Sequence, residues 1–317
     1  MDTDKDKMQQ DIMVARMYYE QELSQNQIAD QLGISRPTVS RLLQAAKKNG
    51  LVRIQIMDPV QSSETLATRL KDRYQLKEAY VVPVQTVSAG SSLDAIGQYA
   101  ANYLSELIGD HDTIGIGWGK TIHSIANHLN LNEEVSDVSV VQLKGSVSYS
   151  KQHTYAFESI NAFAAAFHTV PQYLPLPVIF DQKMTKDLVE KERHIQHLIQ
   201  LGKQANVAVF TVGTVRDSAL VLNLNYFSEE EISYLQEHAV GDIFSRFIDE
   251  NGQVVCDEIN QRTIGIDLPD LRTKDHSIMV VTGDAKAAAI DGALNGHYAN
   301  TLIIDQHTAQ TLINYRD

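Results

Sequence analysis

The chain has 317 residues, 43% of them hydrophobic and 21% charged, with one cysteine and a formal net charge of −13. This length suits about two globular domains, and the composition excludes a wholly disordered chain. The single cysteine, Cys256, excludes an intrachain disulfide and a multi-cysteine metal site, so we interpret it as a core residue. No uncharged apolar run approaches the ~20 residues of a membrane span, and the polar N-terminus does not resemble a signal peptide. We therefore expect a soluble cytoplasmic protein that does not contact membranes.

Charge is unevenly distributed along the chain. Residues 1–57 carry eight basic and seven acidic side chains, whereas the rest carries nineteen basic and thirty-three acidic ones. Five basic residues and no acidic residue lie between Gln31 and Met57. Only this N-terminal part of the chain would attract a polyanion, because the acidic remainder would repel one.

Apolar residues at helical spacing predict three helices within the first fifty residues. The first covers about 8–21. Ser24 is a suitable N-cap for the second helix, which ends at Gly33, and Ser35 is a suitable N-cap for the third. The small side chain of Ala29 allows two of these helices to cross closely. This spacing is typical of a helix-turn-helix.

The third predicted helix ends near Gly50, and the alternating segment 51–57 then indicates a short strand, as in a winged helix-turn-helix. We expect DNA contacts from side chains suited to base edges or phosphates, namely Gln25, Arg36, Pro37, Thr38, Ser40, Arg41, Lys47 and Arg53. The alternative is a small helical dimerisation module whose charges are merely solvated. The lack of acidic residues over 31–57 argues against that alternative.

Asp58-Pro59 and the polar residues after it mark a domain boundary. We predict a helix-turn-helix DNA-binding domain over 1–58 and an effector-binding and oligomerisation domain over 59–317. Short apolar segments alternate with helical ones in the second part, which predicts a Rossmann-like, doubly wound α/β domain with a mainly parallel sheet. Asn251-Gly252 indicates a hairpin turn inserted into this scheme. Ligands of such sheets bind beyond the carboxyl ends of the strands, so the residues there are the candidate site.

The first of these strand ends is the glycine-rich segment 115–121, GIGWGKT. Gly119, Lys120 and Thr121 offer donors at the start of a helix, which suits a phosphate. A P-loop is excluded because Ile114 stands where its first glycine would be, and a dinucleotide site lacks the required glycine spacing. The alternative is a glycine turn that serves only close packing.

Lys144 ends another apolar strand, and we expect it and the following Gly145 and Ser146 to contact the effector. Burial lowers the pKa of such an amine, and a neutral amine can condense with an open-chain sugar aldehyde to a Schiff base. The alternative is a permanently charged lysine that pairs with a phosphate or a carboxylate. The residues alone favour that alternative.

Other strand ends supply further candidate effector ligands. Gly213 and Thr214 offer backbone and hydroxyl groups. Asp242 orients a ligand hydroxyl or, alternatively, only caps a hairpin. Gly283 and Lys286 suit a second phosphate contact, the alternative being a solvated lysine at a helix start.

Metal and hydrolytic chemistry lack their usual patterns. The eleven histidines are dispersed with no H-x-x-x-H zinc pair beside a glutamate, and His194 and His197 read as solvated surface residues. No G-x-S-x-G elbow is present. We therefore expect no metal, no cofactor and no catalytic residues.

With these residues in view, the chain resembles the SorC family of sugar-responsive bacterial transcription regulators. The resemblance runs from end to end, through LSQNQIADQLGISRPTVSRLLQAAKKNGLVRI, GIGWGKT, VVQLKGS, GKQANVAVFTVGTVRD and GALNGHYANTLIIDQHTA. Within the family, the members that regulate deoxyribonucleoside genes are most similar in VVQLKGSVS, HTYAFESI, QYLPLPV and VGDIFSRF.

The resemblance implies a repressor of deoxyribonucleoside and deoxyribose catabolic genes that acts as a homo-oligomer, dimer or tetramer, on operator DNA. Its effector domain would be related to sugar-phosphate isomerases, and its inducer would be deoxyribose 5-phosphate, bound through a Schiff base to Lys144. The family's phosphate-binding loops correspond to Gly119, Lys120 and Thr121, and to Gly283 and Lys286. Asp284 departs from the pattern, because an acid would repel a phosphate unless its side chain turns away.

Two alternatives stay open. The regulator could answer to another phosphosugar. The chain could also be a Schiff-base aldolase or sugar-phosphate isomerase with an added N-terminal module, although turnover needs positioned acid–base groups and the sequence offers no compelling set near Lys144.

Overall fold

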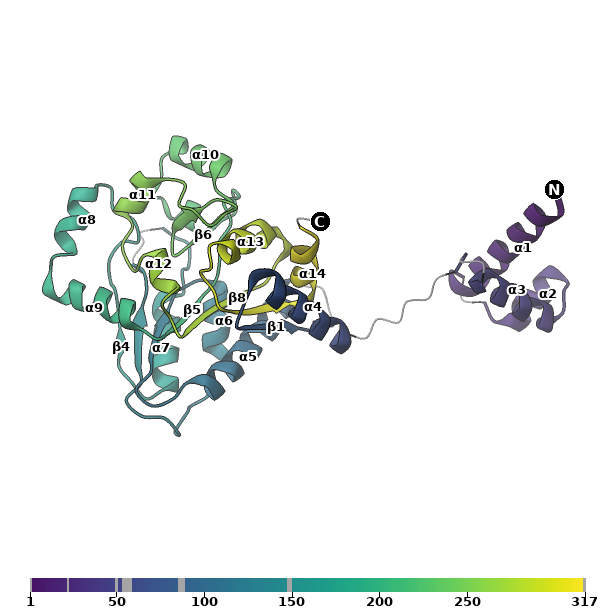
Figure 1. Cartoon of the computed structure of the whole chain (residues 1–317), viewed down its shortest axis with the longest axis horizontal. Helices are drawn as coiled ribbons and strands as arrows, with labels where there is room; N and C mark the ends of the chain where they lie inside the picture. The colour runs from purple at the N-terminus through teal and green to yellow at the C-terminus, as the bar shows by residue number, and fades with distance from the viewer. Residues whose placement is uncertain are drawn as a thin grey trace. The chain divides into compact units, whose positions relative to one another are not determined.

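The computed structural model describes residues 2–21, 23–48, 51–52, 59–84, 89–146 and 150–315. The chain divides into two compact units, Met1–Asp58 and Pro59–Asp317, which we name the helix-turn-helix unit and the sheet unit (Figure 1). None of the helices in the described ranges combines the length and apolar character that a membrane crossing requires.

The helix-turn-helix unit consists of α1 (Asp2–Tyr19), α2 (Gln25–Leu32) and α3 (Arg36–Lys48). Its core is built from one face of each helix: Val14, Met17, Ile28, Ala29, Val39, Leu42 and Leu43. The predicted helix-turn-helix is confirmed. The predicted wing over 51–57 lies mostly outside the described residues, as do Gly50 and Arg53.

Local capping explains where α2 and α3 begin and end. Ser24 and Gln27 form a reciprocal capping box at the start of α2, and Gly33 ends it with φ of 63°. The Ser35 hydroxyl accepts the Thr38 N–H at 3.3 Å at the start of α3. These caps are as predicted. The start of α1 is not, since it begins at Asp2 rather than near residue 8.

The sheet unit contains seven strands in the order β1-β9-β8-β5-β2-β3-β4, and every neighbouring pair is parallel. The strands are β1 (Glu78–Val82), β2 (Thr113–Ile116), β3 (Ser139–Gln142), β4 (Pro171–Gln172), β5 (Val207–Phe210), β8 (His276–Val281) and β9 (Thr301–Asp305). The predicted α/β sheet is confirmed.

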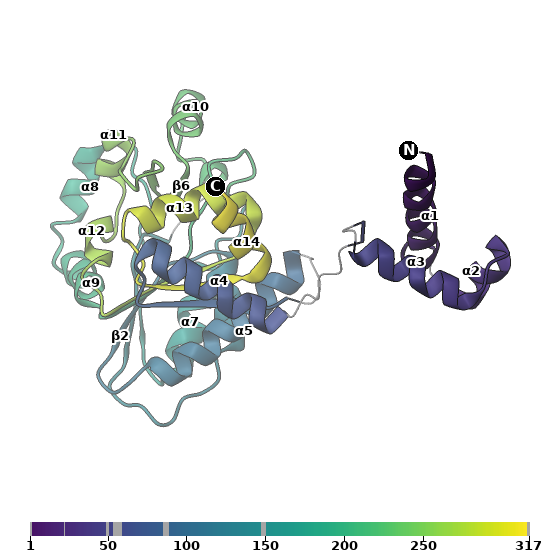
Figure 2. The same cartoon turned by 45° about the vertical axis from the view of Figure 1, so that its right-hand side comes forward.

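Helices cover both faces of this sheet (Figure 2). The side chains of β5 alternate between two separate cores, with Val207 and Val209 in one and Ala208 and Phe210 in the other. The first core includes side chains of α5 (Ala89–Leu107), α6 (Lys120–His128) and α7 (Ala156–Ala166). The second includes side chains of α4 (Pro59–Tyr74), α9 (Arg193–Gln204), α13 (Ala287–Asn295) and α14 (Gln306–Asn314).

A small antiparallel hairpin, β6 (Gly241–Ile243) and β7 (Arg246–Ile248), is inserted between β5 and β8. Its turn is Phe244-Ser245, with φ of 53° and 64°, a left-handed conformation that side chains rarely adopt. The predicted turn at Asn251-Gly252 is also present and supports a single bridge from Ile248 to Val254. Short elements complete the unit: α8 (Lys183–Val189), η1 (Val221–Leu224), α10 (Glu229–His238), α11 (Asp257–Arg262), α12 (Leu268–Leu271) and η2 (Asp284–Lys286).

The strand order changes direction at β2. From β2 the chain continues to β3 and β4 on one side of the sheet, and then returns to β5 on the other side. The connections that leave β2 and β5 therefore diverge, which opens a crevice at their carboxyl ends.

Candidate functional site

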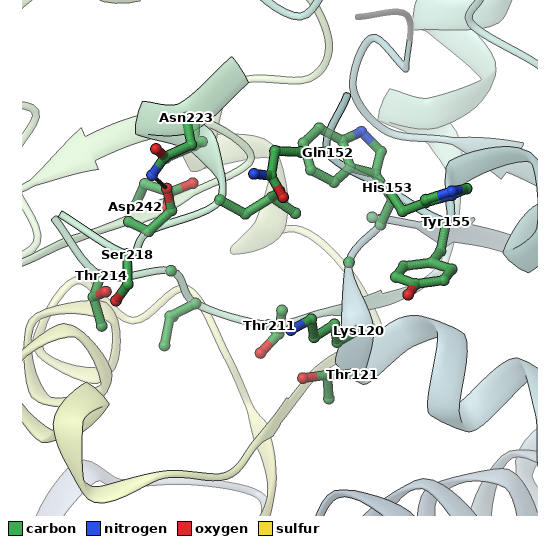
Figure 3. Close-up of a pocket in the computed structure, with 18 of the residues that line it drawn as sticks. Lys120, Thr121, Gln152, His153, Tyr155, Thr211, Thr214, Ser218, Asn223 and Asp242 are labelled. Carbon is green, nitrogen blue, oxygen red and sulfur yellow. Dashed lines mark hydrogen bonds between the residues drawn. The ribbon is translucent and has the colours of Figure 1, made fainter. Parts of the chain in front are cut away.

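A cavity of about 680 Å³ lies at this crevice. Its walls come from the segments that follow β2, β3 and β5, together with the β6–β7 hairpin and the start of α13. Figure 3 shows Gln152, His153 and Tyr155 facing Ser218, Asn223 and Asp242, with Lys120, Thr121 and Thr211 between the two groups. Most of the predicted effector ligands line this cavity: Gly119, Lys120, Thr121, Lys144, Gly213, Thr214, Asp242 and Lys286.

The segment after β2 combines two uses of glycine. A Cβ at Gly115 would lie 2.4 Å from the Leu143 side chain, so this glycine serves close packing. Gly119 has φ of 124° and nothing near its missing Cβ, so it is required by backbone conformation alone. It stands directly before α6, whose first residues Lys120 and Thr121 line the cavity. This arrangement presents a helix N-terminus to the cavity and suits an anion.

Lys144 is the buried amine of the site, with 6% of its surface exposed. Its Nζ lies 3.5 Å from the centre of the Trp118 ring and 3.5 Å from the Ser245 hydroxyl. Burial lowers the pKa of Lys144 to about 8, against the opposing charge of Asp242. A substantial fraction of this amine is therefore neutral near pH 8, as nucleophilic attack requires.

Asp242 and Lys286 complete the charged part of the cavity. Burial raises the pKa of the Asp242 carboxyl, while Lys144, the Ser245 N–H and Lys286 act in the opposite direction. Burial also lowers the pKa of Lys286 to about 8, again opposed by Asp242. One buried carboxyl is thus shared electrostatically by two lysines. Lys286 lines the cavity but is only partly buried, so its role as an effector ligand stays a prediction.

Three predicted ligands do not line the cavity. The Gly145 carbonyl accepts the Trp118 Nε1–H at 2.8 Å, and the Ser146 hydroxyl donates to the Leu174 carbonyl at 3.1 Å. The Gly283 N–H donates to the Thr308 hydroxyl at 2.8 Å and is not free for a phosphate. These groups already bond to neighbouring segments and lie outside the cavity wall, so their direct contact with an effector stays a prediction that this cavity does not support.

Asp284, the acid that departs from the family pattern, also lies outside the cavity wall. Its carboxylate pairs with the His307 ring at 2.8 Å, and both side chains are exposed. An acid held in this position does not conflict with an anion near Lys286.

Sequence reasoning missed several groups of the cavity. Trp118 was read only as part of a glycine-rich loop, yet it supports Lys144. The Thr211 hydroxyl oxygen is buried without a hydrogen-bond partner in the described structure. Two connecting segments, 151–155 and 217–223, supply most of the remaining wall. The order of apolar segments gives no signal for either of them. No group of three or more metal-ligating side chains is found among the described residues.

The predicted DNA contacts gather on α3 and the start of α2. Arg36, Pro37, Arg41 and Lys47 are exposed, while Gln25, Thr38 and Ser40 are partly exposed. Arg41 donates to the Thr38 hydroxyl at 3.4 Å, and Lys47 lies over the Tyr19 ring. The buried residues of α3 point the opposite way, so this face is available to a DNA groove.

Comparisons with known proteins agree with both units. Residues 58–314 match a family described as a sugar-binding domain, and residues 8–61 match the Crp-like helix-turn-helix domain. The chain is 51% identical over 311 residues to the Deoxyribonucleoside regulator of Bacillus subtilis strain 168, covering 98% of this chain and 99% of that protein. It is 31% identical to the Sorbitol operon regulator of Klebsiella pneumoniae, covering 95% and 96% of the two chains.

Solved structures give the same result. The full-length sorbitol operon regulator SorC from Klebsiella pneumoniae superposes with a TM-score of 0.72 at 29% identity, covering 96% of this chain and 98% of that one. A transcriptional regulator from Streptococcus pneumoniae TIGR4 has a TM-score of 0.75 at 25% identity over 81% of this chain and 99% of that one. The chain therefore belongs to the SorC family, as a DNA-binding transcription regulator with a helix-turn-helix and a sugar-binding domain.

Proposed function

We propose that this protein represses genes of deoxyribonucleoside and deoxyribose catabolism and is released from operator DNA by deoxyribose 5-phosphate. The name of the 51% identical relative supports the class of genes. The observation that carries the choice of effector is Lys144, a buried amine with its pKa lowered to about 8 in a cavity that also offers an anion site. In this proposal the open-chain sugar is held as a Schiff base on Lys144.

Two groups of the cavity support this bond in the proposal, the Lys144 amine and the Trp118 ring. The neutral Lys144 amine adds to the aldehyde carbon, and the resulting carbinolamine takes up a proton and loses water. The iminium that remains is a cation, and the Trp118 ring beneath Nζ stabilises a cation in that place. The phosphate would lie against Gly119, Lys120 and Thr121 at the start of α6, or against Lys286.

Release from DNA would follow from a difference in affinity. A sugar phosphate that binds the low-affinity form preferentially weakens DNA binding by the same coupling free energy, typically about 1–3 kcal/mol. A homo-oligomer with two helix-turn-helix units about one DNA turn apart amplifies this change, because both units must fit at once.

Borohydride trapping tests the covalent effector directly. The full-length protein is incubated with deoxyribose 5-phosphate and borohydride, and its intact mass is measured before and after. We expect one reduced adduct per chain, mapping to Lys144 in a peptide digest, and none in Lys144→Met. Absence of an adduct with deoxyribose 5-phosphate would contradict the proposed Schiff base.

A panel of other phosphosugars distinguishes the second effector hypothesis. The cavity is lined beyond Lys144 by further polar side chains, including Lys151, Gln152 and Asn223, which would favour a larger or more hydroxylated ligand. If another aldose phosphate formed the adduct and released operator DNA at lower concentration, the regulator would answer to that sugar instead. Alditol phosphates serve as controls, because they carry no carbonyl group that could condense with the amine.

A further inference from the structure

One side chain of the cavity has a free functional atom that capture of an aldehyde does not require. Asp242 is buried, and its Oδ2 accepts the Ser245 N–H at 2.9 Å. Its other oxygen, Oδ1, has no hydrogen-bond partner among the residues that the structure describes, although Asp242 lines the cavity. A buried carboxylate oxygen left open in this way is available to a ligand or to a proton.

The same turn holds Asp242 and Lys144 in a fixed relation. Ser245 receives the Lys144 Nζ at 3.5 Å on its hydroxyl and presents its N–H to Asp242. Phe244 and Ser245 are both buried and both in the left-handed region, a costly conformation that persists only where the surroundings impose it. Because the turn is imposed, the amine and the carboxylate are preorganised toward each other.

Gly213 gives the carboxylate its place at the end of β5. A Cβ on this residue would come within 2.0 Å of Asp242 Oδ1, so the oxygen occupies the space that a side chain would otherwise fill. Backbone hydrogen bonds in both directions between Gly213 and Asp242 keep the two residues together. Asp242 Oδ1 is therefore held at the strand ends, on the side of the cavity where Lys144 also lies.

We propose that this site also activates the carbon next to the captured aldehyde, with Asp242 as the base, and thereby exchanges one C2 hydrogen of a 2-deoxy sugar phosphate with solvent. The proposal rests on the proposed function, because it requires the Schiff base on Lys144. It assigns a chemical activity to the regulator that leaves the sugar intact.

The step balances without any further reactant. Once Lys144 is joined to C1 as an iminium, the electron pair of one C2–H bond becomes the C1–C2 double bond, and the C1–N double-bond pair moves to nitrogen. The proton passes to Asp242 Oδ1. The carboxylic acid exchanges that proton with water, returns a solvent hydrogen to C2, and the iminium is restored. Nothing is oxidised or reduced, and no carbon–carbon bond breaks.

Proton NMR in deuterated water tests this proposal with the full-length protein. Deoxyribose 5-phosphate is incubated with the protein near pD 8, and the two C2 proton signals are followed while borohydride trapping is run in parallel. We expect loss of one C2 signal and retention of the other, because Asp242 approaches the planar iminium from one face. Lys144→Met should abolish the exchange.

Asp242→Asn removes the proposed base and leaves the nucleophile, Lys144, in place. Asparagine still accepts the Ser245 N–H, so the turn is kept, but it takes no proton from carbon. We expect exchange to fall by about 10²-fold or more, the usual contribution of a positioned base. The borohydride adduct should still form, with its pH midpoint moved to lower pH because Asp242 no longer favours the charged form of Lys144. Asp284→Asn is the matched control, because Asp284 is exposed, pairs with His307 and lies outside the cavity wall. It should exchange at the rate of the unsubstituted protein.

The outcomes separate this inference from the function on which it rests. An adduct on Lys144 without C2 exchange overturns the inference and leaves the effector proposal standing. If neither the adduct nor the exchange is observed, the effector proposal itself is overturned. Normal exchange in a folded Asp242→Asn protein, verified by its thermal unfolding, overturns the assignment of Asp242, and equal loss of both C2 signals overturns its one-sided placement.

Discussion

The basic side chains of the two units differ in how far they are exposed to solvent. Arg36, Arg41 and Lys47 lie on the exposed face of α3, whereas Lys144 lies beneath the surface of the cavity beside Lys286. An exposed guanidinium stays charged at any physiological pH and acts on DNA phosphates through its field. Burial lowers the pKa of Lys144 and of Lys286 to about 8, so these two amines are partly neutral near that pH and can act as nucleophiles.

Under the proposed function, this difference explains how one acidic chain can bind two anionic ligands, operator DNA and a sugar phosphate. The helix-turn-helix unit attracts a polyanion with solvated charge, so its binding should weaken steeply as salt screens that charge. In the proposed effector site, the charged groups lie in a cavity where salt screens them less, but their charge depends on pH. Operator binding is therefore expected to follow ionic strength, and effector capture to follow pH.

The largest expected effect separates the two units completely. Arg41→Ala should weaken operator binding by about 1–3 kcal/mol and leave the borohydride adduct unchanged. Lys144→Met should abolish the adduct and release by the sugar phosphate, yet bind operator DNA like the unsubstituted protein. Gel-shift titrations with and without deoxyribose 5-phosphate measure both. Loss of DNA binding in Lys144→Met would contradict this separation.

The pH dependence of adduct formation should show the burial of Lys144. Only the neutral amine attacks, and its fraction falls about tenfold for each pH unit below the pKa. The rate of borohydride trapping at limiting sugar should therefore rise up to about pH 8 and level off above it. A solvated lysine would give a rate that still rises toward its ordinary pKa of 10.5. Such a profile would contradict the buried site.

Gly213→Ala tests whether Asp242 affects the pH profile of adduct formation on Lys144. The added methyl group meets Asp242 Oδ1 and displaces the carboxylate that favours the charged form of Lys144. We expect the midpoint of the trapping profile to move to lower pH. Overpacking should also lower the free energy of unfolding of the sheet unit by about 1–3 kcal/mol. An unchanged midpoint in the folded variant would show that Asp242 does not act on Lys144.

The smallest expected effect is a loss of stability in one unit at a time, and two equivalent helix caps, one in each unit, test it. Ser24→Ala removes the capping box of α2 and should lower the stability of the helix-turn-helix unit by about 1 kcal/mol. Ser228→Ala removes the equivalent box of α10 in the sheet unit. Calorimetry should show each change in only one of two unfolding transitions. A shift of both transitions by either variant would show that the units unfold together.

Local patterns account for what could be predicted. The helix-turn-helix depends on neighbours in sequence, such as Ser24 with Gln27 and Gly33 at the end of α2, so its residues carry the whole signal. Lys144 and Gly119 were identifiable because each follows a strand directly. The first helix was harder, since it was expected to begin near residue 8 and begins at Asp2.

The rest of the site depends on contacts between distant segments. Trp118 contacts Lys144, and Ser245 contacts both Lys144 and Asp242. Trp118 and Ser245 are both distant from Lys144 in sequence, so hydrophobic periodicity cannot predict these contacts. The Phe244-Ser245 turn was missed because neither residue ordinarily favours a left-handed backbone. Gly145, Ser146 and Gly283 follow strands as ligands do, yet their polar groups already bond to neighbouring segments. A position after a strand identifies candidate effector ligands, and tertiary contacts then determine which of them line the cavity.

The pairing of β1 with β9 has a consequence during synthesis. Glu78 is opposite Thr301, so β1 cannot form its hydrogen bonds in the sheet until β9 has been synthesised. β8 likewise needs β9 on one side. A ribosome must therefore release the chain as far as Asp305 before the sheet can close, long after the helix-turn-helix sequence has emerged. A message truncated before Thr301 would still encode the helices of the helix-turn-helix unit but no closed sheet, so under the proposed function such a truncation is expected to yield unresponsive repression or rapid proteolysis rather than a partly inducible protein.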